Sequence, residues 1–154
     1  HQMTKQLITG TFVNCVLATT TLLAGLSSGI AVALISPVCA FFFGIAPNLI
    51  TVVPIMVGNT CFVVLLGLIY GKTLWRQVGA LAAGAVVKFG VLYVLVVQVV
   101  CNLAAGFLME QAVLKAPMLT KLPAMFTWPQ LFTALIGGAV ALLIVPVLRK
   151  ALKK

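Results

Sequence analysis

The sequence predicts an all-α integral membrane protein, in which residues 1–154 form one domain, a compact bundle of six transmembrane helices. Residues 6–71 contain no Asp, Glu, Lys, Arg or His. At about 1.5 Å per residue, this run allows two or three crossings of a hydrocarbon layer roughly 30 Å thick. With 63% hydrophobic and 7% charged residues, the chain has too few polar side chains to cover a soluble globule. Helices are favoured over a β-barrel because regular polar–apolar alternation between turns is missing.

Gly and Pro divide the charge-free run into three predicted helices. Residues 25–29 and 44–48 combine these helix-breaking residues with Ser or Asn, which cap helices. The predicted helices cover residues 4–25, 29–44 and 48–70.

The second half begins after a polar loop at residues 71–77. The stretch 77–113 is too long for one ordinary crossing, and the six-helix prediction divides it in two, although no strong turn signal marks the division. Residues 114–128 contain two lysines and two prolines and predict a loop outside the bilayer core. The last helix is predicted at 129–148, where small residues at four-residue spacing indicate close helix packing: Thr133, Gly137 and Ala141.

Basic residues flank the apolar runs, and five of the ten lie at the two ends of the chain: Lys5, Arg149, Lys150, Lys153 and Lys154. The positive-inside rule then predicts a cytoplasmic-membrane protein with both termini in the cytoplasm and an even number of crossings. Six crossings place Lys72 and Arg76 outside, against the rule. An alternative with four full spans, a re-entrant segment at 29–44 and one tilted helix at 77–106 therefore stays open.

Composition argues against several function classes. The net charge is +9, but the basic residues form no stripe with interleaved aromatic residues, which argues against nucleic-acid binding. Glu110 is the only acid, so no paired-carboxylate site can form. We expect His1 and Gln2, ahead of Met3, to be a cloning remnant. No metal, cofactor or enzymatic activity is predicted, because the four cysteines are widely spaced and typical of small buried hydrophobes: Cys15, Cys39, Cys61 and Cys101.

Apolar patterns with scattered Gly, Pro and Asn run through nearly the whole chain. Examples are Val53-Pro-Ile-Met-Val-Gly-Asn59 and Trp128-Pro-Gln-Leu-Phe-Thr-Ala-Leu-Ile-Gly-Gly138, and others lie at 12–25, 28–37, 43–47 and 87–93. Together these segments resemble the S components of energy-coupling-factor (ECF) transporters, which are small bacterial membrane proteins.

The resemblance implies a binding subunit that captures a vitamin or related micronutrient from outside. It also implies partners: a transmembrane coupling subunit and two ATP-hydrolysing subunits. The sequence contains no Gly-rich phosphate-binding loop ending in Lys and Ser or Thr, so ATP would be hydrolysed by those partners. In the family, a small-residue repeat on the first helix contacts the coupling subunit. The family's alanine pairs are missing here, and the candidate faces are Gly10, Asn14 and Ala18, or Thr11, Cys15 and Thr19.

Lys88 is the first candidate for substrate binding. It lies eleven residues beyond Gln77, at mid-membrane depth for a helix that starts there, and an unpaired charge at that depth is costly. Gly84 and Ala80 precede it on the same helix face and leave room for a ligand or a neighbouring helix. Lys88 is then either a counter-charge for a carboxylate or phosphate of the substrate, or a lysine that extends to the membrane surface.

Uncharged amides at membrane depth are the second set of candidates. They can orient a small molecule by hydrogen bonds, or join helices to one another: Asn14, Asn59, Gln98 and Asn102. Asn48, after Pro47, is predicted to be a helix N-cap. Trp128 and Gln130, with Phe126, are candidates for closing the site from the last loop, although an aromatic belt at the membrane surface explains Trp128 equally well.

The leading hypothesis is a pocket near the outer leaflet, lined by the last three helices and the last loop. The charge balance favours an anionic or neutral amphipathic micronutrient and argues against cobalt, nickel or strongly cationic ligands. Besides the substrate and the energising subunits, membrane lipid is expected to contact the protein. The alternatives are a channel or self-assembling membrane protein without a specific cargo, and a membrane enzyme, for which the sequence offers no nucleophile and base.

Overall fold

A computed structural model describes residues 2–153, and helices make up almost all of this range. His1, expected to belong to a cloning remnant, and Lys154, counted among the terminal basic residues, lie outside it. The elements are α1 (Gln2–Ala24), α2 (Leu26–Phe42), the 3₁₀ turn η1 (Leu49–Thr51), α3 (Val52–Ile69), α4 (Leu74–Leu92), the π-helical segment η2 (Tyr93–Leu103), α5 (Ala105–Glu110), α6 (Ala116–Met125) and α7 (Trp128–Leu152).

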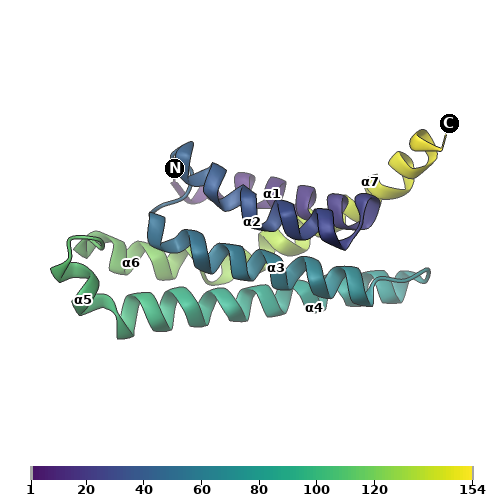
Figure 1. The fold of residues 1–154 in the computed structure, drawn as a ribbon. Coiled ribbons are helices and arrows are strands. Elements are labelled where there is room, and N and C mark those ends of the chain that lie inside the picture. The colour runs from purple at the N-terminus through teal and green to yellow at the C-terminus, as the bar shows by residue number, and fades with distance from the viewer. Residues whose placement is uncertain (1, 154) are drawn as a thin grey trace.

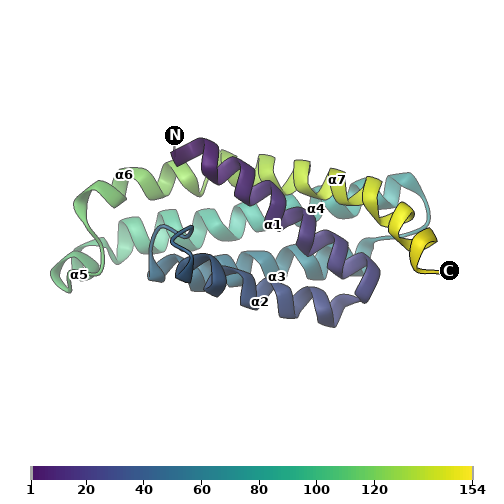
Figure 2. The same cartoon turned by 90° about the horizontal axis from the view of Figure 1, so that it is seen from above.

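The helices lie side by side along one long axis (Figures 1 and 2). α1, α2, α3 and α4 run in alternating directions, and η2 continues α4. α6 and α7 follow one another in a single direction. Four helical stretches are long and apolar enough to cross a membrane, Met3–Ala24, Leu49–Ile69, Leu74–Leu103 and Ala116–Leu152, and α2 is a shorter apolar helix. The prediction of an all-α membrane protein is confirmed.

Two elements of the second half differ from the prediction. The stretch 77–113 was expected to hold two helices, but one continuous helix runs from Leu74 to Leu103. Gly90 does not interrupt it, because a single Gly only weakens a helix. The expected loop at 114–128 contains the helix α6 instead. Pro117 lies in the first turn of α6, where the missing N–H has no intrahelical partner to lose.

Glycines form the two turns of the first half. Gly25 (φ 94°) separates α1 from α2, and Gly44 (φ 68°) follows α2. A positive φ is readily adopted only by Gly, so both turns were readable from the sequence. The predicted cap at Asn48 is confirmed, since its side-chain oxygen accepts a hydrogen bond from the backbone N–H of Ile50 at 3.2 Å.

The two chain ends lie near opposite ends of the bundle (Figure 1). The prediction of two cytoplasmic termini requires an even number of crossings. The bundle has an odd number of helical paths along its long axis, formed by α1, α2, α3, α4 and α6–α7. The helix arrangement therefore does not bring the termini to one end, because one helix runs from Leu74 to Leu103 where the prediction had two. The membrane side of each terminus stays a prediction.

Two apolar clusters hold the bundle together. One joins α1, α2, α3, α4 and α7, and the other joins the end of α4, η2 and α6. Along α4, Ala85 belongs to the first cluster and Leu92 to the second. Lys88, the charged residue between them, therefore lies where the two clusters meet.

The predicted small-residue stripe of α7 packs against α1. Thr133, Gly137 and Ala141 are all buried. A Cβ atom added to Gly137 would overlap the backbone oxygen of Thr11 and lie 2.9 Å from the backbone nitrogen of Cys15. The absence of a side chain at Gly137 thus lets the two helix backbones approach closely.

Candidate functional site

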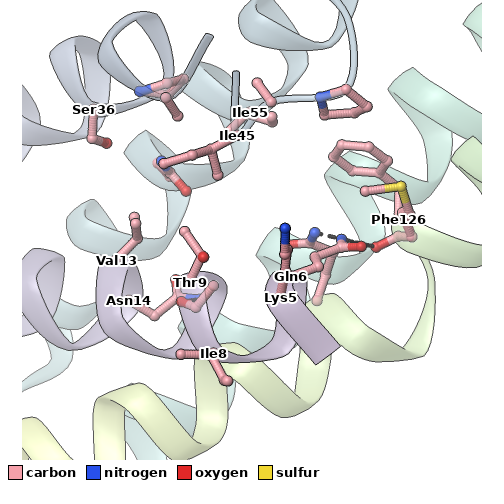
Figure 3. Close-up of a pocket in the computed structure, with 18 of the residues that line it drawn as sticks. Lys5, Gln6, Ile8, Thr9, Val13, Asn14, Ser36, Ile45, Ile55 and Phe126 are labelled. Atoms are coloured by element: carbon pink, nitrogen blue, oxygen red, sulfur yellow. Dashed lines mark hydrogen bonds between the residues drawn. The ribbon is translucent and has the colours of Figure 1, made fainter. Parts of the chain in front are cut away.

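A pocket of about 660 Å³ opens at the end of the bundle where α1 begins and α2 ends. Its walls come from the first half of α1, the second half of α2 and the loop between α2 and α3. Figure 3 shows Thr9 and Val13 of α1 facing Ile45 and Ile55 across the pocket, with Gln6 and Phe126 to one side. Asn59 of α3 and Lys88 of α4 complete the lining. The volume is typical of small-molecule sites, which measure roughly 300–1,000 Å³.

Lys88 places a buried ammonium at this pocket. The residue is 3% exposed, and its Nζ donates a hydrogen bond to Asn14 Oδ1 at 2.6 Å. The same nitrogen lies 5.7 Å from the centroid of the Phe62 ring, within the range of a cation–π contact. Glu110, the only acid of the sequence, is exposed at the end of α5. Within residues 2–153, the positive charge of Lys88 is therefore met by an amide oxygen and an aromatic ring, and by no carboxylate.

Asn14 of α1 holds the Lys88 side chain in place. Its Nδ2 donates to the backbone oxygen of Gly10 at 2.8 Å and lies 3.3 Å from Thr133 Oγ1. Its Oδ1 accepts from Lys88. The amide thus bonds in three directions and links α1, α4 and α7.

The face of α1 that carries Gly10, Asn14 and Ala18 is covered by α7. A Cβ atom at Gly10 would lie 3.1 Å from Thr133 Cγ2, and Asn14 and Ala18 are buried. The expectation that this face docks a coupling subunit does not agree with the packing, because four-residue spacing marks a packing face without saying what packs on it. Thr11, Cys15 and Thr19 are half-buried, and the first two lie against Gly137.

Buried polar atoms without a hydrogen-bond partner gather at the pocket. In the described part of the chain there are four such side-chain atoms: Gln6 Oε1, Ser36 Oγ, Asn59 Nδ2 and Asn59 Oδ1. All three residues line the pocket. An unpartnered buried polar group costs about 1–3 kcal/mol, so a cluster of them requires an explanation. Polar groups of a bound small molecule would supply the missing partners.

This arrangement provides one buried cation, several amide groups and apolar walls. Between residues 2 and 153, no three His, Cys, Asp or Glu side chains lie close enough together to hold a metal ion. The pocket is thus suited to holding an organic molecule by charge, hydrogen bonds and apolar contact.

Comparison with protein families gives the class of transporter. The family model described as "ECF transporter, substrate-specific component" matches residues 3–149. The chain belongs to this family. It is the substrate-specific subunit, or S component, of an ECF transporter, and S components are transport subunits rather than enzymes. Membership implies a small-molecule substrate and association with energising modules. No curated protein and no solved structure matches the chain.

The S component's pocket differs from the expected one in position. The sequence indicated a pocket lined by the last three helices, whereas α1, α2 and the loop after α2 supply most of the lining. Of the expected site residues, five line the pocket: Asn14, Asn59, Lys88, Phe126 and Gln130. Gln130 donates from Nε2 to the backbone oxygen of Met125 at 3.2 Å.

Three expected site residues of this S component lie outside the pocket. Gln98 and Asn102 are exposed and hydrogen-bond to one another at 3.2 Å, and Gln98 also donates to the Tyr93 hydroxyl. Trp128 is 63% exposed and stacks on Phe89 at a centroid distance of 5.6 Å. Gln98 and Asn102 lie outside the pocket because they belong to η2. The wider turn of a π-helix rotates them away from the face of Lys88, near which a continuous α-helix would have kept them.

Two pocket residues of the S component that carry unpartnered polar atoms were missed. Gln6 lies one turn before Gly10 on the same face of α1, and its Nε2 donates to the backbone oxygen of Met125 at 2.7 Å. Extending the Gly10–Asn14 spacing backward by one turn would have found it. Ser36 precedes Pro37 within α2, and no signal in the sequence distinguishes it from other helical serines.

Proposed function

We propose that this S component binds a small anionic or neutral vitamin-like micronutrient in the pocket beside Lys88. A separate transmembrane coupling subunit and two ATP-hydrolysing subunits then energise its delivery. The observation that carries the proposal is the buried ammonium of Lys88 at the pocket, which faces no carboxylate within residues 2–153. A buried charge without a counter-charge is costly, and an anionic substrate would offset that cost.

Charge distribution supports a pocket that opens to the outside. Near the end of α7 and the turn between α3 and α4 lie five basic residues: Lys72, Arg76, Arg149, Lys150 and Lys153. Arg149 also donates to the backbone oxygen of Leu22 at 2.8 Å, which brings the end of α1 to the same place. By the positive-inside rule this end is cytoplasmic. The pocket lies toward the opposite end, as capture from outside requires.

Mass spectrometry of small molecules that co-purify with the protein tests the proposal. The wild-type protein, purified in mild detergent, is expected to retain one defined molecule in equimolar amount. Lys88→Met is expected to retain at least tenfold less, because it removes the charge and keeps an unbranched apolar side chain of similar size. Lys121→Met is the matched control, since Lys121 is exposed on α6 and outside the pocket. Wild-type protein without any retained molecule would contradict the proposal.

The proposed energising partners require a second measurement. Uptake of the retained molecule into membrane vesicles is expected only when the coupling and ATP-hydrolysing subunits are present together with ATP. Uptake by the S component alone, at the same rate, would favour the channel alternative.

A further inference from the structure

Positive charge gathers at the end of the bundle that lies away from the pocket. The turn between α3 and α4 and the last turns of α7 carry five exposed basic residues, which we call the basic end: Lys72, Arg76, Arg149, Lys150 and Lys153. The only acid of the sequence, Glu110, lies on α5 at the other end of the bundle (Figure 1). Within residues 2–153, no carboxylate side chain therefore neutralises the basic end.

The two arginines of the basic end lie against neighbouring turns. Arg149 Nη2 donates to the backbone oxygen of Leu22 at 2.8 Å, which is one of the carbonyls that the last turn of α1 leaves without a helical partner. Arg76 packs on Gly71, where an added Cβ would lie 2.8 Å from Arg76 Nε. A guanidinium has five N–H donors, and the bond to Leu22 uses one of those of Arg149. Because both side chains are held in place, an anion that binds them has less side-chain motion to restrict.

Exposed apolar side chains lie beside these charges. Trp75 directly precedes Arg76 and is 85% exposed, and Leu152, near the end of α7, is 75% exposed. Trp is enriched where the membrane meets water. A phospholipid offers a phosphate and, directly below it, apolar acyl chains, so one kind of molecule matches both features. The combination therefore favours lipid over an acidic protein or a nucleic acid.

We propose that the basic end is a binding site for the headgroups of anionic phospholipids. The lipid phosphate accepts hydrogen bonds from the guanidinium and ammonium groups, and the apolar side chains contact the upper part of the acyl chains. Lipid bound in this way holds the end of α7 and the turn before α4 at the level of the membrane surface. The site lies outside the pocket, and the proposal does not depend on the substrate.

Lipid retention tests the proposal. The full chain, purified in mild detergent, is incubated with equal amounts of phosphatidylglycerol and phosphatidylcholine that carry the same acyl chains. Native mass spectrometry then counts the lipids that stay bound. We expect the wild type to retain at least about fivefold more phosphatidylglycerol than phosphatidylcholine. Raising the salt concentration should reduce this ratio, because salt screens exposed charges.

Two pairs of substitutions separate the basic end from the net charge of the protein. Arg76→Gln/Arg149→Gln removes two charges from the basic end, and we expect the ratio to fall close to one. Lys115→Gln/Lys121→Gln is the matched control, because it removes two exposed charges at the other end of the bundle. This control should keep the wild-type ratio.

A third pair covers the case in which the arginine variant is poorly folded. Lys72→Gln/Lys150→Gln also removes two exposed charges from the basic end, and it leaves the bond between Arg149 and Leu22 in place. We expect this pair to lower the ratio as well, with the unfolding temperature of the wild type.

Inorganic phosphate distinguishes a lipid site from a site for free phosphate. Added in excess, it should displace no more phosphatidylglycerol than sodium chloride does at the same ionic strength. Stronger displacement by phosphate would indicate a phosphate site and would overturn the proposal.

The remaining outcomes decide between lipid and other partners. A preference for phosphatidylglycerol that the basic-end pairs reduce and the control pair keeps supports the proposal. Equal retention of the two lipids by the wild type overturns it and leaves an acidic surface of a partner subunit as the occupant. An equal loss in the control pair and the basic-end pairs overturns it too, because the preference would then follow net charge alone. None of these results changes the expected retention of substrate.

Discussion

Lys88 Nζ donates a hydrogen bond to Asn14 Oδ1 at 2.6 Å and so joins two residues that are 74 positions apart in the chain. Asn14 in turn donates hydrogen bonds to the backbone oxygen of Gly10 and to Thr133 Oγ1. The bond lies inside an apolar bundle, where hydrogen bonds are stronger than in water and unpaired polar groups are more costly. It fixes the ammonium at the pocket and ties α1, α4 and α7 together at one point.

Replacing Asn14 tests this connection. Asn14→Leu leaves the buried ammonium without its oxygen acceptor, and we expect the free energy of unfolding to fall by about 2–4 kcal/mol. Thr133→Val removes the acceptor at 3.3 Å and the hydroxyl's own bond to the backbone oxygen of Gln130, while Asn14 keeps its bond to Gly10. It should cost no more than about 1 kcal/mol. Thermal unfolding in detergent measures both variants. Equal stability of Asn14→Leu and the wild type would show that the connection is not structural.

Lys88 itself is expected to behave in the opposite way. Lys88→Met removes a buried charge and keeps an unbranched apolar stem, so the desolvation cost disappears together with the hydrogen bond. We expect the unfolding temperature of the ligand-free protein to stay the same or rise. The same measurement on Lys121→Met, at an exposed site on α6, gives the effect of losing a surface charge. A marked drop for Lys88→Met alone would assign the lysine a structural role.

The fold could be predicted from the sequence where a single residue decides the backbone. Gly25 and Gly44 have positive φ, and the turns fall where the sequence indicated them. The helix from Leu74 to Leu103 could not be distinguished from two shorter helices, because hydropathy is the same in both cases. The π-helical segment that begins at Tyr93 contains no Gly or Pro from which the change in hydrogen bonding could have been predicted. In α6 the prolines were read as a loop, although Pro117 is compatible with a first helical turn.

The candidate site could be predicted where a polar residue stands alone in an apolar helix. Lys88, Asn14 and Asn59 are such residues, and all three line the pocket. Which of them pair was not predictable, since the bond between α1 and α4 depends on tertiary packing rather than spacing. Gln98 and Asn102 satisfied the same rule, but η2 rotates them to the exposed surface.

Gly137 provides a test of the packing between α7 and α1. Gly137→Ala places a methyl group against the backbone of Thr11 and Cys15, which cannot move as a flexible side chain can. Overpacking of this kind costs about 1–3 kcal/mol, and we expect a lower unfolding temperature in detergent. Gly79→Ala is the matched control on α4, because nothing lies within 4 Å of its added methyl group. That variant should be neutral or more stable by up to about 1 kcal/mol, since Ala favours helices. If both variants unfold alike, the close approach of α1 and α7 is wrong.

Cysteine labelling decides how the bundle lies in the membrane. In a background without the four native cysteines, Lys72→Cys and Lys153→Cys are expected to react with a membrane-impermeant reagent from the cytoplasmic side only. Thr4→Cys and Lys121→Cys are expected to react only from outside, because α1 begins and α6 lies at the other end of the bundle (Figure 1). All four positions are exposed, so unequal reactivity would reflect the side of the membrane rather than burial. Labelling of Thr4→Cys from the cytoplasm would restore the even number of crossings that the terminal charges predicted. Labelling of Lys72→Cys from outside would show that the basic end of the bundle faces outward. The pocket would then open toward the cytoplasm, which would contradict capture of the substrate from outside.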